Sequence, residues 1–129
     1  MATNPSFAVT PRVASVNIAT ANTARDGTGT LSTLITGAST GTRVAELVCQ
    51  AKVTTTAGMV RIFLFDSPNT ATYFFDEVSI AAATVSASVK GTRVSTLYNN
   101  LVLPSASWSI RVSTHNAESI DVTALGADL

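Results

Sequence analysis

Histidine and carboxylate side chains are the residues of this chain whose types could support acid–base or metal chemistry, and they are few. His115 is the single histidine, which excludes a metal site built on several histidines. His115 and Glu118 are three positions apart, a spacing that brings side chains together on a helix but not in a turn between strands. We therefore interpret His115 as a solvent-facing turn residue without a catalytic role.

Three carboxylates, Asp66, Asp76 and Glu77, flank a strong turn signal at residues 67–69, Ser-Pro-Asn. If the two flanking strands pair, these side chains could meet and support general acid–base chemistry or Ca²⁺ binding. Arg61 lies in the first of the two strands and offers a simpler partner. The sequence therefore favours a cross-strand ion pair over a catalytic or Ca²⁺ site.

The other motifs also favour structural roles. The segment 26–29, Asp-Gly-Thr-Gly, resembles part of a calcium or phosphate loop, but it lacks the further carboxylates of an EF-hand and the lysine of a P-loop. We interpret its glycines as turn residues. Serine is frequent, yet no G-x-S-x-G motif is present, and one histidine leaves a triad without an orienting partner. The sequence predicts no enzyme, and no cofactor or metal site.

Aromatic residues suggest the one small-ligand hypothesis. Trp108, Tyr73 and Tyr98 could stack on sugar rings, since sugars pack against aromatic faces. Trp108 alternates in phase with Ile110 and Val112, which favours a core position. Both interpretations stay open: a core tryptophan, or a carbohydrate-binding module in which Trp108 and Tyr98 carry the site.

The single cysteine, Cys49, excludes an internal disulfide framework. It lies in the apolar run Ala-Glu-Leu-Val-Cys-Gln-Ala-Lys-Val, which predicts a small buried side chain and not a reactive thiol.

The elements that must position these residues are β-strands. β-branched residues and period-two alternation recur between turns that contain Gly, Asn or Pro, which is typical of a sandwich or barrel. The predicted fold is all-β: an antiparallel, jelly-roll-like β-sandwich of about eight or nine strands, with no helix assigned. The expected strands cover residues 16–18, 30–36, 43–55, 59–66, 72–80, 89–98, 101–103, 108–113 and 120–124.

Two of these strands carry specific expectations. The strand at residues 43–55 alternates most clearly, and its predicted buried face consists of Ala45, Leu47, Cys49, Ala51 and Val53. The strand at residues 59–66 is apolar on both faces at one end, so we expect cover on both sides. In the strand at residues 72–80, Asp76 shares the apolar face, a conflict that a strand end or a cross-strand partner would relieve.

Residues 1–13 contain Pro5 and Pro11 and show little periodicity. We predict that they form an extended N-terminal arm and that residues 14–129 form one β-sandwich domain. Phe7 and Val9 are apolar side chains in this otherwise polar arm, so we expect them to contact another subunit.

The composition indicates a surface that faces other proteins. Charged residues make up 12% of the chain, against about 25% in an average domain, and serine and threonine take their place. The net charge is zero and the basic residues are scattered, so neither nucleic acid nor an anionic membrane is an expected partner. No apolar run approaches the ~18 residues of a membrane helix, and the N-terminus does not resemble a secretory signal. We expect synthesis in the cytoplasm of a bacterial host.

Three segments together resemble a known group of proteins: Thr55–Asp66 (TTAGMVRIFLFD), Asp76–Ile80 (DEVSI) and Leu101–Leu129, with Asn22–Thr30 (NTARDGTGT) fitting the same pattern. They resemble small all-β virion proteins encoded among the structural genes of tailed bacteriophages and prophages. The likeness covers residues 15–129 and its motifs are turns and strands.

The resemblance implies a virion structural protein located in the phage particle. It implies a capsid decoration or accessory protein that forms a homo-oligomer, with a trimer expected, and that binds other capsid or tail subunits. The alternative is a carbohydrate-binding or receptor-binding sandwich module of a tail or fibre. No catalytic residue is carried over, and head or tail location and oligomer symmetry stay open.

Overall fold

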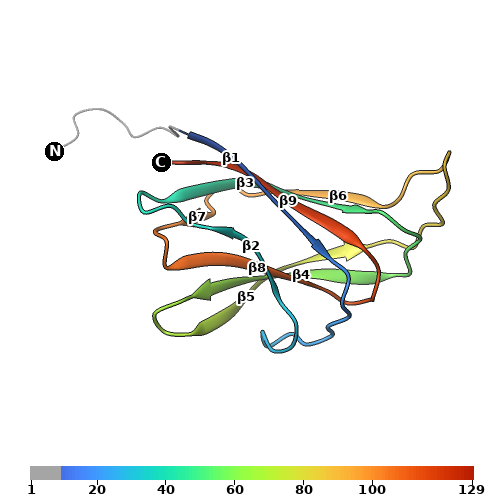
Figure 1. Ribbon diagram of the computed structural model, residues 1–129, viewed down its shortest axis with the longest axis horizontal. Coiled ribbons are helices and arrows are strands. Elements are labelled where there is room, and N and C mark those ends of the chain that lie inside the picture. Colours follow the sequence, from blue (N-terminus) through green and yellow to red (C-terminus); the bar gives the residue numbers. More distant parts are fainter. Residues whose placement is uncertain (1–9) are drawn as a thin grey trace.

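The computed structural model describes residues 10–129, and these form strands, turns and loops without a helix (Figure 1). Accordingly, this part of the chain has no helix that could cross a membrane. The strands are β1 (Thr10–Ile18), β2 (Ser32–Thr36), β3 (Thr42–Ala51), β4 (Gly58–Asp66), β5 (Ala71–Ile80), β6 (Arg93–Leu97), β7 (Val102–Leu103), β8 (Trp108–Thr114) and β9 (Ile120–Asp128).

The strands pair into two antiparallel sheets. The first sheet has the order β1-β9-β3-β6, with the two-residue β7 also paired to β3, and the second has the order β2-β8-β4-β5. Most strands lie in the opposite sheet from the strand that precedes them in the chain. Each sheet therefore combines strands from the N-terminal and C-terminal halves of the chain. The architecture confirms the predicted antiparallel, jelly-roll-like β-sandwich.

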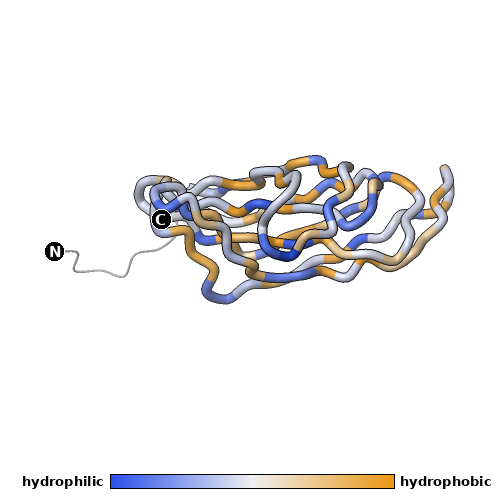
Figure 2. The backbone as a smooth tube through the Cα atoms, turned by 90° about the horizontal axis from the view of Figure 1, so that it is seen from below, coloured by the Kyte–Doolittle hydropathy of each residue, from blue (hydrophilic) through white to orange (hydrophobic). Residues whose placement is uncertain are grey.

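Apolar side chains from both sheets fill the space between the layers. Figure 2 shows that hydrophobic residues occur along both layers and are separated by hydrophilic ones, as expected for strands with one face in a core. Cys49 is 1% exposed, which agrees with its predicted packing role. The most deeply buried large side chains include Leu47, Ile62, Val60, Val112, Ile110 and Val122.

A β-bulge corrects the predicted buried face of β3. The register with β9 shifts between Val44 and Glu46, so that Ala45 has no residue opposite it. The extra residue turns Val44 into the core, where its exposed fraction is 0%, and leaves Ala45 half-buried. The strand also ends at Ala51, so Val53 is exposed instead of buried.

The strand β4 is covered on both faces, as its sequence predicts. Val60 and Ile62 face the core and are fully buried, while Arg61 and Phe63 on the opposite face are also almost inaccessible. The cover on this outer face comes from the loop 19–31, which connects β1 with β2 and lies across β8, β4 and β5.

Asn22 organises the loop 19–31 from a buried position. Its backbone N–H donates to the Thr114 carbonyl at 2.8 Å, and its side-chain amide donates to the carbonyls of Thr28 and Thr30 at 3.0 and 2.9 Å. Gly27 and Gly29 adopt φ values of +85° and +78°, which confirms their predicted use as turn residues.

The N-terminal boundary differs from the prediction. β1 begins at Thr10 and pairs with β9 over its whole length, so residues 10–13 belong to the sandwich and not to an arm. Pro11 is compatible with this because β1 is an edge strand, where a missing N–H group breaks no ladder. The other residues of the predicted arm, with Phe7 and Val9, lie outside the described residues.

Candidate functional site

The side of the sandwich between β5 and β6–β7 holds both aromatic residues that the sugar-binding hypothesis names. Trp108 begins β8 opposite Asp66, on the same face as Ile110, so it is in phase with the core. It lies at the end of the sheet, however, and remains half-buried. Its indole stacks on Tyr73 with ring centroids 6.5 Å apart and planes at 25°.

Tyr98 connects the two sheets on this side. Its backbone N–H donates to the Ala45 carbonyl at 2.8 Å, which fixes it beside β3 in the first sheet. Its hydroxyl donates to Asp76 Oδ2 of β5 in the second sheet at 2.6 Å, and its ring lies 5.5 Å from that of Phe75. Asp76 lies on the apolar face of β5 and therefore needs a hydrogen-bond partner there, and Tyr98 is that partner.

Each of these aromatic residues lines its own shallow hollow, and the two hollows are neighbours. Trp108 contributes to one of about 220 Å³ and Tyr98 to one of about 400 Å³. Leu64 and Val102 line both hollows, which therefore form one apolar surface. It lies along the side of the sandwich between β5 and β6–β7, which we call the open side. Trp108 and Tyr98 thus lie on a common surface without sharing a single pocket.

The Tyr98–Asp76 pair has no free capacity for acid–base chemistry. Burial, followed by the hydrogen bond to Asp76 and the charge of Asp76, raises the pKa of Tyr98 far above its usual value. The hydroxyl therefore stays protonated at every ordinary pH and donates to Asp76 Oδ2. The pair has a structural role and holds the edge of β5 against the first sheet.

A run of three aromatic residues leaves much apolar surface exposed on β5. Tyr73 is 53% exposed and Phe74 and Phe75 are 39% exposed each. A β-bulge between the pairs Ile62–Asp76 and Phe63–Phe74 places Phe75 outside the regular pairing. In residues 10–129, no strand pairs with the outer edge of β5. This surface was not predicted from the sequence, although the consecutive aromatic residues are visible in the chain.

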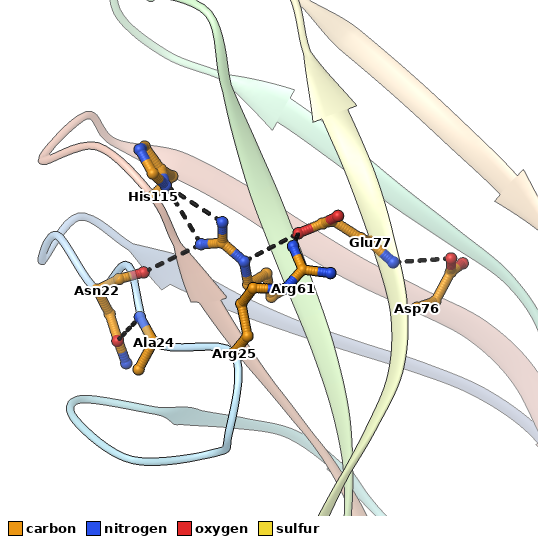
Figure 3. Close-up of polar contacts among 7 residues, drawn as sticks. All are labelled: Asn22, Ala24, Arg25, Arg61, Asp76, Glu77 and His115. Atoms are coloured by element: carbon orange, nitrogen blue, oxygen red, sulfur yellow. Dashed lines mark hydrogen bonds and ion pairs between the residues drawn. The ribbon is translucent and has the colours of Figure 1, made fainter.

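A polar cluster on the outer face of the second sheet is centred on Arg61 (Figure 3). The guanidinium of Arg61 donates from Nε to Glu77 Oε2 at 2.9 Å and from NH1 to the Asn22 carbonyl at 3.3 Å. Arg25 of the loop 19–31 reaches the same Glu77 oxygen at 2.7 Å. The cluster confirms the predicted cross-strand ion pair and fastens the loop 19–31 to β4 and β5.

His115 belongs to this cluster, which corrects its interpretation as a solvent-facing residue. Both terminal nitrogens of Arg61 lie 3.3 Å from His115 Nδ1. A guanidinium can only donate, so His115 Nδ1 is the acceptor in this contact. The turn position of His115 was predicted, but its contact with β4 depends on pairing that no local pattern reveals.

The charges of the cluster compensate one another. Partial burial raises the pKa of the Glu77 carboxyl, but the hydrogen bonds and charges of Arg25 and then Arg61 outweigh this effect and lower the pKa below its usual value. Glu77 therefore stays ionised against both cations. A hollow of about 360 Å³ beside the cluster is lined by Arg25, Ala57, Gly58, Met59, Arg61, Glu77, Ser79 and His115.

The carboxylates do not converge on a metal site. Asp66 accepts a hydrogen bond from Asn69 at 2.6 Å, while Asp76 and Glu77 are engaged by Tyr98 and Arg61 on opposite faces of β5. Across residues 10–129, no three His, Cys, Asp or Glu side chains are grouped so that they could hold a metal ion. The three carboxylates stabilise the fold through these contacts.

Comparison with known proteins gives a likeness among solved structures. No protein-family model matches the chain, and no curated protein matches it. Among solved structures, the chain is similar to a chain of the "Cyanophage Pam1 capsid asymmetric unit", with a TM-score of 0.47 and 14% sequence identity, over 100% of this chain and 92% of that one.

Proposed function

We propose that the protein is a structural component of a bacteriophage virion, a head decoration or capsid accessory protein that self-associates and binds other virion subunits. The observation that carries the proposal is the exposed apolar surface on the open side of the sandwich. Tyr73, Phe75 and Val102 contribute to it, with exposed fractions of 53%, 39% and 42%. Contiguous exposed apolar surface of this kind marks protein interaction sites.

Two further features support this proposal. The low charge content of the chain fits a surface that is covered by protein, because interface cores are depleted in charged residues. The sequence segments that resemble phage virion proteins include all of β4, part of β5 and all of β7, β8 and β9, so they contain Leu64, Val102 and Trp108 of this surface. The resemblance gives a trimer as the expected assembly.

Light scattering over a range of concentrations tests self-association. A trimer would have a mass of about 40 kDa against 13.3 kDa for one chain. The double variant Tyr73→Ser/Val102→Ser removes two exposed apolar side chains from the open side and should shift the protein towards the monomer. Val13→Ser is the matched control, because Val13 is 71% exposed on β1 at the other side of the sandwich.

Co-sedimentation with purified phage heads tests the virion role. The wild-type protein should bind the particles at a fixed stoichiometry, and the double variant should bind less. A protein that stays monomeric at every concentration and does not bind particles would contradict the proposal. Equal self-association of the double variant and the wild type would show that the open side is not the contact surface.

The position of Trp108 and Tyr98 on neighbouring hollows favours a second candidate, a carbohydrate-binding or receptor-binding module of a tail or fibre. In that case, oligosaccharides of the host cell surface should change the fluorescence of Trp108 and protect it from acrylamide quenching. Trp108→Ala should abolish binding measured by calorimetry. Unchanged fluorescence across a panel of host oligosaccharides would reject this candidate.

A further inference from the structure

The outer edge of β5 is the part of the molecule most suited to receive another strand. It is ten residues long, and within residues 10–129 no other strand pairs with that edge. An unpaired edge presents N–H and C=O groups that template pairing with another chain. Beside this edge lies the apolar surface that Leu64, Val102 and Trp108 line.

We infer that the edge of β5 receives residues 6–9 of a second copy of this chain as an added strand. This inference rests on the proposed self-association and specifies its geometry. In strand addition, main-chain hydrogen bonds give affinity and alternate side chains enter pockets. Phe7 and Val9 are two positions apart, so an extended backbone directs both side chains to one face, where the apolar hollow is available.

The chemistry of the segment agrees with that of the receiving surface. Residues 1–9 contain no charged side chain, so docking on an aromatic surface would bury no unpaired charge. Pro5 has no N–H to donate, and an added strand would therefore begin after it. The remaining stretch, Ser-Phe-Ala-Val, leads directly into β1 at Thr10.

The reach of the chain requires a second copy. Phe7 is three residues before Thr10, so its Cα lies within about 11 Å of the start of β1. β1 and β6 are at opposite edges of the first sheet, three strand spacings or about 14 Å apart. β5 lies on the same side of the sandwich as β6 but in the second sheet, and the two sheets are about 10 Å apart. Residues 7–9 therefore cannot pair with the β5 of their own chain.

Such a contact is heterologous, because one surface of each copy meets a different surface of the next. Heterologous contacts close into rings when the rotation between copies is suitable. The inferred geometry therefore accommodates the expected trimer, in which each copy gives one segment and receives one.

Disulfide trapping between two singly substituted proteins tests this geometry. One protein carries Phe7→Cys, the other carries Tyr73→Cys on β5, and the two are mixed under mild oxidation. Mixed disulfide dimers are expected. The matched control is Thr33→Cys, an exposed position on β2 at the other edge of the same sheet, and it should give none. Cys49 does not interfere because it is 1% exposed.

A second measurement uses dilution followed by light scattering. Phe7→Ser/Val9→Ser should raise the dissociation constant of the oligomer by about tenfold or more, because apolar anchors dominate interface energies. Ala8→Ser is the control on the opposite face of the segment and should have little effect.

The outcomes separate the inference from the proposed function. If the oligomer persists and Tyr73→Cys chains link only to each other, β5 pairs with β5 and the inference is overturned. Linkage of Phe7→Cys to Thr33→Cys or only to itself, or no linkage within a stable oligomer, also overturns it. If the wild-type protein never self-associates, the proposed function fails together with the inference.

Discussion

Tyr98 and Tyr73 illustrate how two tyrosines on one surface can have different roles. The Tyr98 hydroxyl donates to Asp76 and joins the sheets. The Tyr73 hydroxyl has no hydrogen-bond partner within residues 10–129, and its ring contributes exposed area and stacks on Trp108. The difference follows from the bulge at Phe75, which directs Asp76 towards the first sheet.

Tyr98→Phe should destabilise the protein by about 1–3 kcal/mol, because it leaves Asp76 Oδ2 without its donor on the inner face of β5. Tyr73→Phe is the matched control and should change stability by less than about 0.5 kcal/mol. Urea unfolding of the three proteins measures both effects. Equal effects of the two substitutions would show that the inter-sheet hydrogen bond adds no stability.

Cys49 should make the protein less stable at alkaline pH. Burial raises the pKa of its thiol to about 12, from about 9 when exposed. Between these values the unfolded chain loses the thiol proton and the folded chain keeps it, so stability is full below pH 9 and falls as the pH rises. The loss from this group is about 1.4 kcal/mol per pH unit above 9.

Urea unfolding at pH 8 and pH 10 measures this dependence. The wild type should lose more stability between the two values than Cys49→Ala, and comparing the losses cancels the cost of the smaller side chain. Tyr98 acts in the same direction in both proteins, since its pKa is also raised. Equal losses in the two proteins would contradict the assignment to Cys49.

At the scale of the strands, the bulge between β3 and β9 depends on Gly126. Gly126 lies opposite Val44 at the bulge, and a Cβ atom there would clash with the Arg43 carbonyl oxygen. Since that oxygen is backbone, it cannot move without disturbing the ladder. The absence of a side chain at this position lets the two strands approach.

Gly126→Ala should therefore destabilise the protein by about 1–3 kcal/mol through overpacking. Gly58→Ala is the matched control at another strand glycine, where the added Cβ would meet the flexible side-chain amide of Asn116 at 2.6 Å. Thermal unfolding of both variants measures the contrast. A smaller effect at Gly126 than at Gly58 would contradict this account of the bulge.

The same bulge marks the limit of what the alternation pattern could predict in β3. Period-two alternation correctly places Leu47, Cys49 and Ala51 in the core, because the strand is regular there. It fails at Ala45 and Val44, since one extra residue reverses the face of all that precedes it. A bulge depends on the partner strand, so the sequence of β3 alone does not reveal it.

The candidate site was predictable only in its parts. The sequence names Trp108 and Tyr98 as aromatic residues of interest and pairs Arg61 with a carboxylate across the turn at residues 67–69. The neighbouring positions of Trp108 and Tyr98 arise from packing β8 against the β6–β7 side, which involves residues far apart in the chain. The contact of Arg61 with His115 has the same origin.

For the whole molecule, the proposed assembly is held together by apolar contacts and main-chain hydrogen bonds. The chain has a net charge of zero and 12% charged residues. Salt screens charge–charge attraction and leaves apolar burial intact. The dissociation constant of the oligomer should therefore change less than about threefold between 50 and 500 mM NaCl. Sedimentation equilibrium at both salt concentrations measures it, and a large weakening at high salt would indicate an ion-paired interface instead.

The pairing of β1 with β9 joins the first and the last described strands. During synthesis on the ribosome, β1 emerges early but has no permanent partner until residues 120–128 follow it, so the first sheet closes last. β4, β5 and their aromatic run emerge midway, and β8 reaches them before β9 appears. The nascent chain therefore exposes the unpaired edge of β5 while both sheets are still incomplete, and such an edge can pair with a neighbouring chain on the same polysome.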